Sequence, residues 1–215
     1  MNRADIKEAA KAKIKGNKWN IWWPYLLIAI IESVLTGLVG PKIDFTNLDS
    51  LTTTTNLTVG QGVGVTVVAI FTGILTACYL KYIMNFVRTG KFDANVIIKA
   101  FKEKWLKLLV ATIVEGILIC LASILLVIPG IILAFAYAMV DYIILDTDLS
   151  AIDALKKSRE MMRGYKWDFF VFGLSFLGWC LLLIPTFGLL IIWLFPYMTV
   201  AIVMYYEKLK AKKAL

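Results

Sequence analysis

The chain has 215 residues, of which 60% are hydrophobic and 18% charged, and its formal net charge is +8. Soluble domains contain about 45–50% apolar and about 25% charged residues, so this composition excludes an ordinary water-soluble fold. Histidine is absent, which excludes a Ser-His-Asp triad, a Cys-His pair and an HExxH zinc site. We therefore expect an integral membrane protein.

No group of residues has the spacing of a catalytic, metal or cofactor site. Cys78, Cys120 and Cys180 lie in separate apolar segments and lack CxxC spacing. The glycines of 60–64 resemble a phosphate loop only faintly, because no lysine follows them. The sequence predicts no metal, no cofactor and no enzymatic activity.

Six segments are long and apolar enough, or nearly so, to cross a membrane. The hydrocarbon core is about 30 Å thick and a helix rises about 1.5 Å per residue, so a crossing needs about 20 apolar residues. The segments are Trp19–Val39, Val63–Val87, Trp105–Ile128, Ile131–Leu145, Trp167–Ile184 and Phe187–Tyr206. The fourth and fifth are short and would need a thinned bilayer or polar flanks. The predicted fold class is an all-α, polytopic membrane protein with six transmembrane helices.

Basic residues are distributed unevenly between the two sides of this arrangement. With six spans, all of the 23 lysines and arginines except Lys42 fall on one side. Cytoplasmic loops are enriched in Lys and Arg, which places both termini in the cytoplasm. Five or seven spans would scatter these charges, so the distribution favours six. It also explains the net charge without a nucleic-acid partner, and no groove-binding motif is present.

Two connections between predicted spans are short and uncharged. Pro129-Gly130 joins the third and fourth spans, and Pro185-Thr186 joins the fifth and sixth. Proline ends a helix and glycine permits a tight turn, so we expect antiparallel hairpins. The Thr, Gly and Asn content of loop 40–62 predicts a flexible extracytoplasmic segment.

Two stretches that precede predicted spans match one another at an offset of 148 residues. The match pairs Gly16 with Gly164 and Trp19 with Trp167, and a looser third instance ends at Trp105. We interpret the unit as an amphipathic cytoplasmic helix, a Lys-Trp pair at the lipid headgroups and a two-span hairpin. A single membrane domain, 1–215, would then contain the units 1–87, 91–145 and 150–206.

The third unit has the clearest surface helix. Ser150 and Asp153 have the spacing of a capping box, and Ile152, Leu155, Ser158, Met162 and Tyr165 share one helical face. Such a helix can lie on the inner leaflet, with its basic side chains near anionic lipid. The predicted lipid-surface contacts are Lys15, Lys18, Trp19, Lys104, Trp105, Lys156, Lys157, Arg159, Arg163, Lys166 and Trp167. One interpretation is that the surface helices only anchor the hairpins. The alternative is that they bind lipid or a partner in a regulated way.

Five polar side chains inside predicted spans form a candidate functional cluster. A charged carboxylate at mid-bilayer costs about 3 kcal/mol, so each should face the bundle or water. One hypothesis is a cluster that lines a path for cations or protons. The alternative is a structural set of interhelical pairs. The cluster comprises Glu32, Lys81, Asn85, Glu115 and Asp141.

Small residues recur every four positions in the second span, as Ala69, Gly73 and Ala77. Such a stripe permits close approach of helices. It is either an internal packing seam or the face of a homo-oligomer.

Several motifs resemble a bacterial integral-membrane family catalogued as domain of unknown function 975. They are Gly-Asn-Lys-Trp at 16–19, Ile-Pro-Gly-Ile at 128–131, the stretch Ser150–Trp167, and Leu-Ser-Phe-Leu-Gly-Trp at 174–179. The resemblance covers nearly the whole chain. It implies a multi-pass protein of the bacterial cytoplasmic membrane, and it implies no activity, substrate or catalytic residue.

The function expected from these observations is interaction without catalysis. The protein would contact membrane lipids, above all anionic inner-leaflet lipid, or a protein or membrane-active peptide partner, in an accessory, scaffold or immunity-like role. The alternative is a small transporter or channel that uses the intramembrane carboxylates.

Overall fold

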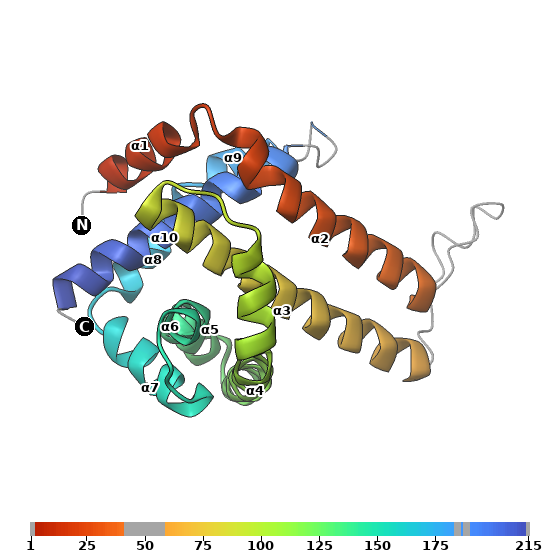
Figure 1. Ribbon diagram of the computed structural model, residues 1–215. Helices are drawn as coiled ribbons and strands as arrows, with labels where there is room; N and C mark the ends of the chain where they lie inside the picture. Colours follow the sequence, from red (N-terminus) through yellow and green to blue (C-terminus); the bar gives the residue numbers. More distant parts are fainter. Residues whose placement is uncertain (1–2, 41–58, 183–185, 187–189, 214–215) are drawn as a thin grey trace.

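The secondary structure of the described residues is entirely α-helical, which confirms the predicted all-α class. The computed structural model describes residues 3–40, 59–182, 186 and 190–213 (Figure 1). The predicted flexible loop lies largely outside this range, and its last residues begin a helix. The helices are α1 (Arg3–Ile14), α2 (Lys18–Val39), α3 (Val59–Thr89), α4 (Asn95–Leu125), α5 (Val127–Tyr137), α6 (Val140–Asp146), α7 (Ala151–Met161), α8 (Lys166–Leu174), α9 (Leu177–Leu181) and α10 (Ile191–Lys213).

Four of the helical segments are long and apolar enough to cross a membrane, by length and composition. They are Lys18–Val39, Val59–Thr89, Asn95–Ile124 and Ile128–Asp146. The last includes α5, α6 and the turn between them. The first four predicted spans are therefore confirmed as candidate membrane helices.

The fifth and sixth predicted spans are not found as long apolar helices among the described residues. The segment 167–184 divides at Ser175 and Phe176 into α8 and α9. A nine-residue helix such as α8 is about 14 Å long, less than half the thickness of the hydrocarbon core. The helix α10 is longer, but it ends in the charged sequence Glu207–Lys213. A six-span arrangement is thus not shown.

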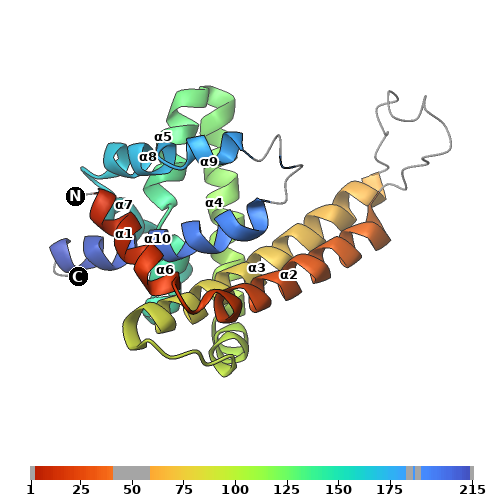
Figure 2. The same ribbon diagram turned by 90° about the horizontal axis from the view of Figure 1, so that it is seen from above.

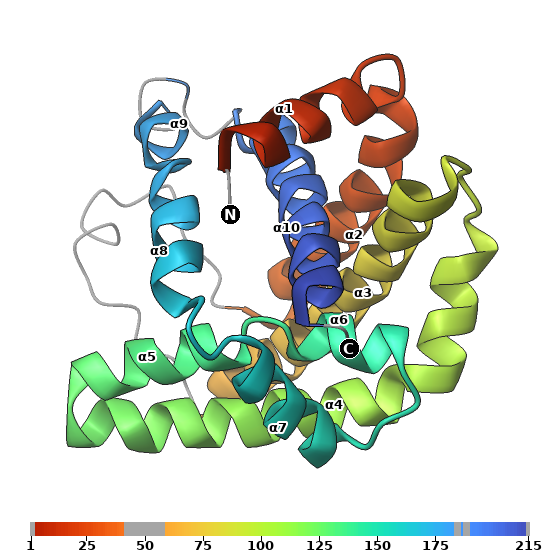
Figure 3. The same ribbon diagram turned by 90° about the vertical axis from the view of Figure 1, so that its left-hand side faces the viewer.

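Contacts place α8, α9 and α10 beside α1 and the first turns of α2. Arg3 of α1 pairs with Asp168 of α8 at 3.3 Å, and the Lys7 amine lies 4.2 Å from the ring centroid of Phe176. At the start of α10, Phe195 stacks on Tyr25 of α2 at a centroid distance of 4.2 Å. Figure 3 faces this side of the molecule, with α1, α8 and α10 in front of α2 and α3.

The two long hairpins leave the packed end of the molecule in different directions. The pair α2–α3 extends to one side, whereas α4–α5 extends along another axis (Figures 1 and 2). They are joined through α3, whose Phe71 ring meets Phe101 of α4 edge-on at 6.3 Å. The described residues therefore do not form one bundle of parallel helices.

The buried core lies where α1, α3, α6, α7 and α10 meet. Ile6, Ile83, Ile144 and Val203 are each fully buried there. Two tyrosines of α3 attach the base of α2, since Tyr79 donates to the Ile21 carbonyl at 3.0 Å and Tyr82 to that of Asn20 at 2.7 Å. Away from this core, the long helices expose large apolar side chains. Examples on α2 and α4 are Ile30, Val34, Leu38, Ile117, Leu121 and Ile124.

The stretches matched at an offset of 148 residues have the same local structure. Gly16 and Gly164 both adopt a left-handed backbone, with φ of +90° and +87°. An added side chain would strain this conformation, so glycine suits both turns. Buried positions also correspond, namely Ile6 with Ala154, Ala10 with Ser158, and Ile14 with Met162. Trp19 and Trp167, which follow the turns, are 69% and 73% exposed.

Neighbouring tyrosines of α10 provide a test of this packing. The buried Tyr205 hydroxyl has no hydrogen-bond partner among the described residues, whereas the Tyr206 hydroxyl donates to Asp146 at 3.1 Å. Tyr205→Phe should leave the free energy of unfolding unchanged or raise it by up to about 1 kcal/mol, and Tyr206→Phe should lower it by about 1.5 kcal/mol. Thermal unfolding of the detergent-purified variants measures both. A larger loss for Tyr205→Phe would contradict this packing.

Candidate functional site

The three tryptophans predicted at the lipid headgroups are all exposed. Trp19, Trp105 and Trp167 have exposed fractions of 69%, 45% and 73%. The first two belong to α2 and α4, which are candidate membrane helices. Tryptophan is enriched at membrane interfaces because its ring is apolar while its N–H needs a polar partner. These rings are therefore accessible for contact with the headgroup region of a membrane.

Most of the cations predicted to contact lipid are also exposed. Lysine and arginine can keep their charged ends in the headgroup layer while their stems cover apolar surface. Side chains of this set that are exposed are Lys15, Lys18, Lys156, Arg159 and Arg163, and those that are half-buried are Lys157 and Lys166. We call Trp19, Trp105, Trp167 and these seven cations the basic-aromatic rim.

Lys104, the remaining predicted lipid contact, is held by protein groups. Its side chain is 14% exposed, and its amine contacts the Asp148 carboxylate and donates to the Thr147 carbonyl at 3.0 Å. The hydrogen bond from Lys104, with the charges of Lys104 and Lys107, holds the pKa of Asp148 below its ordinary value. Lys104 thus fixes the turn after α6.

The amphipathic helix of the third unit, α7, turns its apolar face toward the protein. Ser150 caps it, accepting a hydrogen bond from the Asp153 N–H at 3.2 Å, as the sequence predicts. Leu155 and Ser158 are buried, and the Ser158 hydroxyl donates to the Ala136 carbonyl at 2.9 Å. Of the predicted apolar face, Ile152 alone is exposed. The helices α4, α5 and α6 cover this face.

An ion-pair network around Asp146 links α3, α6 and α10. No pattern in the sequence predicts this network. The Asp146 side chain is only 4% exposed and pairs with Arg88 and Lys210, each at 2.5 Å. Arg88 also pairs with Glu207 at 2.7 Å. The charges come from three helices that are distant in sequence. The only feature that these residues share in the sequence is that each of them follows an apolar segment.

Removing the Asp146 charge should destabilise the packed end. Asp146→Asn leaves two cations facing a neutral amide, and the loss of a buried ion pair costs about 3 kcal/mol. The matched control is Asp148→Asn, whose carboxylate is 97% exposed and should matter far less. Thermal unfolding in detergent compares the two, and equal losses would contradict a special role for Asp146.

The five residues of the predicted intramembrane polar cluster lie in different local environments. Lys81 donates to the Leu145 carbonyl at 2.5 Å, and Asn85 lines a cavity with it. Glu115 is coupled electrostatically to Asp141, whereas Glu32 is exposed and acts on Tyr25. Two of the three acids thus lie close enough to interact electrostatically, and the five residues do not form one chain of contacts among the described residues.

The cavity beside Lys81 has a volume of about 410 Å³ and a polar lining of both charges. Its charged lining residues are the cations Lys81, Arg88, Lys99 and Lys104 and the acids Glu103, Asp146 and Asp148. Asp146 and Asp148 already pair with protein cations. No group of three or more Cys, Asp or Glu side chains in the described part of the chain is placed to hold a metal ion.

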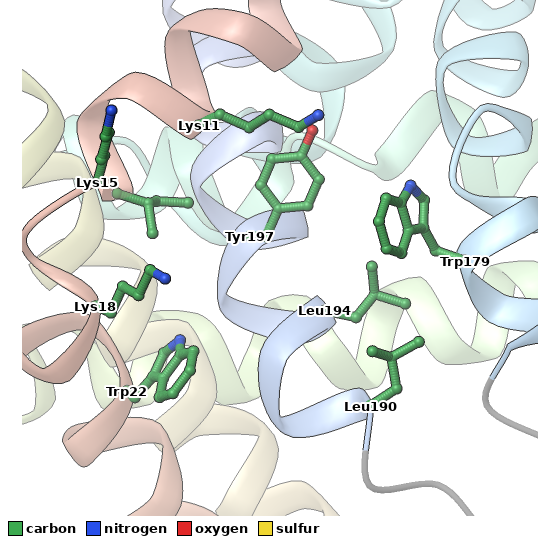
Figure 4. A pocket seen from close by; sticks show the side chains of 9 residues that line it. Lys11, Lys15, Lys18, Trp22, Trp179, Leu190, Leu194 and Tyr197 are labelled. Carbon is green, nitrogen blue, oxygen red and sulfur yellow. The ribbon is translucent and has the colours of Figure 1, made fainter. Parts of the chain in front are cut away.

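A second pocket, of about 320 Å³, has a different character, because its surface is almost wholly apolar and its edge is basic (Figure 4). It lies where α1, α2, α9 and α10 meet. Trp22, Trp179 and Leu194 belong to its apolar lining, and Lys11 is one of three lysines at it. Of its lining residues, only Lys15 and Lys18 are among the predicted lipid contacts, because the walls of the pocket come from opposite ends of the chain.

Comparison with known proteins decides the family. The sequence matches the family described as protein of unknown function (DUF975) over residues 1–129 and 113–213. The chain belongs to DUF975. No curated protein and no solved structure matches it significantly.

Proposed function

We propose that this DUF975 protein is a multi-pass protein of the bacterial cytoplasmic membrane that acts by interaction rather than catalysis. The observation that carries the proposal is the exposed basic-aromatic rim beside long apolar helices. Tryptophan rings and cations at such a boundary favour anionic lipid, each cation contributing about 1 kcal/mol near the surface. Through this rim the protein would serve as an accessory, scaffold or immunity-like component toward lipids, partner proteins or membrane-active peptides.

A transporter or channel is the second candidate, favoured by the coupling of Glu115 with Asp141. Acids within membrane helices that lie near one another can form part of a proton path. Glu32, however, has a different neighbour, which weakens a continuous path. Glu115→Gln should abolish proton or cation flux in liposomes if transport is the function, and a wild-type protein without flux would eliminate it.

We propose further that the chain crosses the membrane four times, with both termini cytoplasmic. The contacts of α8 with α1 and of α10 with the base of α2 support an inner-side location for the segment 167–206. The positive-inside distribution is equally compatible with four or six spans, because Pro185-Thr186 carries no charge. Charge therefore argues against odd numbers of spans, and it does not favour six over four.

Cysteine labelling of intact cells tests this topology. In a chain whose native cysteines are replaced by serine, Thr186→Cys should resist a membrane-impermeant maleimide added outside, as should Lys156→Cys. Thr53→Cys, in the predicted outer loop, serves as the labelled control. Labelling of Thr186→Cys from outside would restore the six-span arrangement, and labelling of Lys156→Cys would reject both.

Dependence on anionic lipid tests the proposed function itself. The protein in nanodiscs with phosphatidylglycerol should unfold at a higher temperature than in phosphatidylcholine alone, because a ligand of the folded state stabilises it. Added salt should reduce the difference by screening exposed charges. Equal unfolding temperatures in the two lipids would contradict an anionic-lipid role.

A further inference from the structure

The apolar pocket among α1, α2, α9 and α10 combines two features that one ligand class satisfies. Trp22 and Trp179 lie on opposite sides of it, with Leu190 and Leu194 nearby (Figure 4). Leu194 is 5% exposed and Trp179 is 46% exposed, so the lining runs from the core to the surface. An apolar ligand segment could enter from the exposed side and bury its surface at the inner end.

The edge of the pocket is positively charged. Lys11, Lys15 and Lys18 line it, and no acidic side chain does so. Within the described part of the chain, neither Lys11 nor Lys15 has a carboxylate at ion-pair distance. Lys7 lies close enough to Lys11 for the two charges to repel, and partial burial together with this repulsion lowers the pKa of Lys7. An anionic group would therefore complement the edge.

The volume of the pocket suits part of an acyl chain. The pocket holds about 320 Å³, which lies in the range of sites that bind small, mostly apolar ligands. The rest of a lipid would remain outside it.

The order of charged and apolar groups matches that of a lipid leaflet. Lys18 begins α2, a candidate membrane helix, and Trp22 lies one turn further along it. Figure 4 shows Lys15, Lys18 and Trp22 following one another along this side of the pocket. A phosphate at the lysines would thus leave its acyl chain directed toward the apolar lining.

We propose that this pocket binds a single anionic phospholipid, with its phosphate at Lys11, Lys15 and Lys18 and part of one acyl chain between Trp22 and Trp179. The proposal rests on the membrane role proposed above and deepens it, because it assigns the lipid one site and one headgroup charge. The remainder of the basic-aromatic rim would then contact lipid without selecting a molecule.

Native mass spectrometry of the full-length protein in detergent tests this site. Dioleoyl phosphatidylglycerol should bind at least tenfold more tightly than dioleoyl phosphatidylcholine. The variant Lys11→Gln, Lys15→Gln, Lys18→Gln should lose at least tenfold in affinity for phosphatidylglycerol. A matched control, Lys91→Gln, Lys102→Gln, Lys208→Gln, removes three exposed charges outside the basic-aromatic rim and should stay within twofold of the wild type.

A second variant tests the apolar part without changing charge. Leu190→Trp should fill the half-buried side of the pocket and reduce phosphatidylglycerol binding about tenfold. If circular dichroism shows that the triple glutamine variant does not fold, binding by Leu190→Trp still tests the proposed site. Unchanged binding by Leu190→Trp would overturn the pocket.

The binding measurements distinguish an error in the assigned lipid site from an error in the proposed function. Equal losses in both triple variants would mean that affinity follows the total surface charge, which overturns the pocket and leaves the proposed interaction with anionic lipid standing. Equal affinity of the wild type for the two lipids would overturn both.

Discussion

The structure depends on long helices whose apolar side chains no other described part of the protein covers. Ile30 and Leu38 on α2, and Leu121 and Ile124 on α4, are exposed over a length that can cross a bilayer. A helix satisfies its own backbone hydrogen bonds, so lipid can surround it without cost to its polar groups. In water the same faces would form large apolar patches. Apart from Glu32 and Glu115, the charged residues of α2 and α4 lie in the N-terminal halves of these helices, and Trp19 and Trp105 of the basic-aromatic rim lie there too.

One end of the molecule is organised as a packed, partly polar core. Buried side chains of α1, α3, α6 and α10 meet there, and Asp146 is surrounded by Arg88, Lys210 and Tyr206. A carboxylate that is 4% exposed needs such partners, because its desolvation is compensated only by close cations and hydrogen bonds. This network fixes α10 against α3 and α6. It thereby positions the opposite end of α10, where Leu194 and Tyr197 line the apolar pocket.

The proposed interaction with lipid follows from the way these two regions adjoin. The rim supplies long-range attraction for anionic headgroups, which salt can screen. The pocket adds selectivity for a ligand with both an anionic and an apolar part, since it combines three lysines with an apolar volume of about 320 Å³. Repeated local structure does not imply repeated function here. Gly16 and Gly164 form equivalent turns, and the helix before each of them buries its apolar face. Lysines near the first turn line the pocket, whereas no residue of α7 does so among the described residues.

The sequence by itself determined the helical class, the first four long apolar segments, the Ser150 cap and the equivalent glycine turns. These features follow from composition, periodicity and local backbone preference, which involve residues close together in the chain. Only the tertiary structure decided that α8 and α9 are short and lie beside α1, that Lys104 is held by Asp148, and that Glu32 is exposed whereas Glu115 is half-buried. It also decided the Asp146 network and the pocket between Lys11 and Trp179. Such contacts join residues up to about 170 positions apart, and hydropathy and charge counts carry no information about which distant faces pack together.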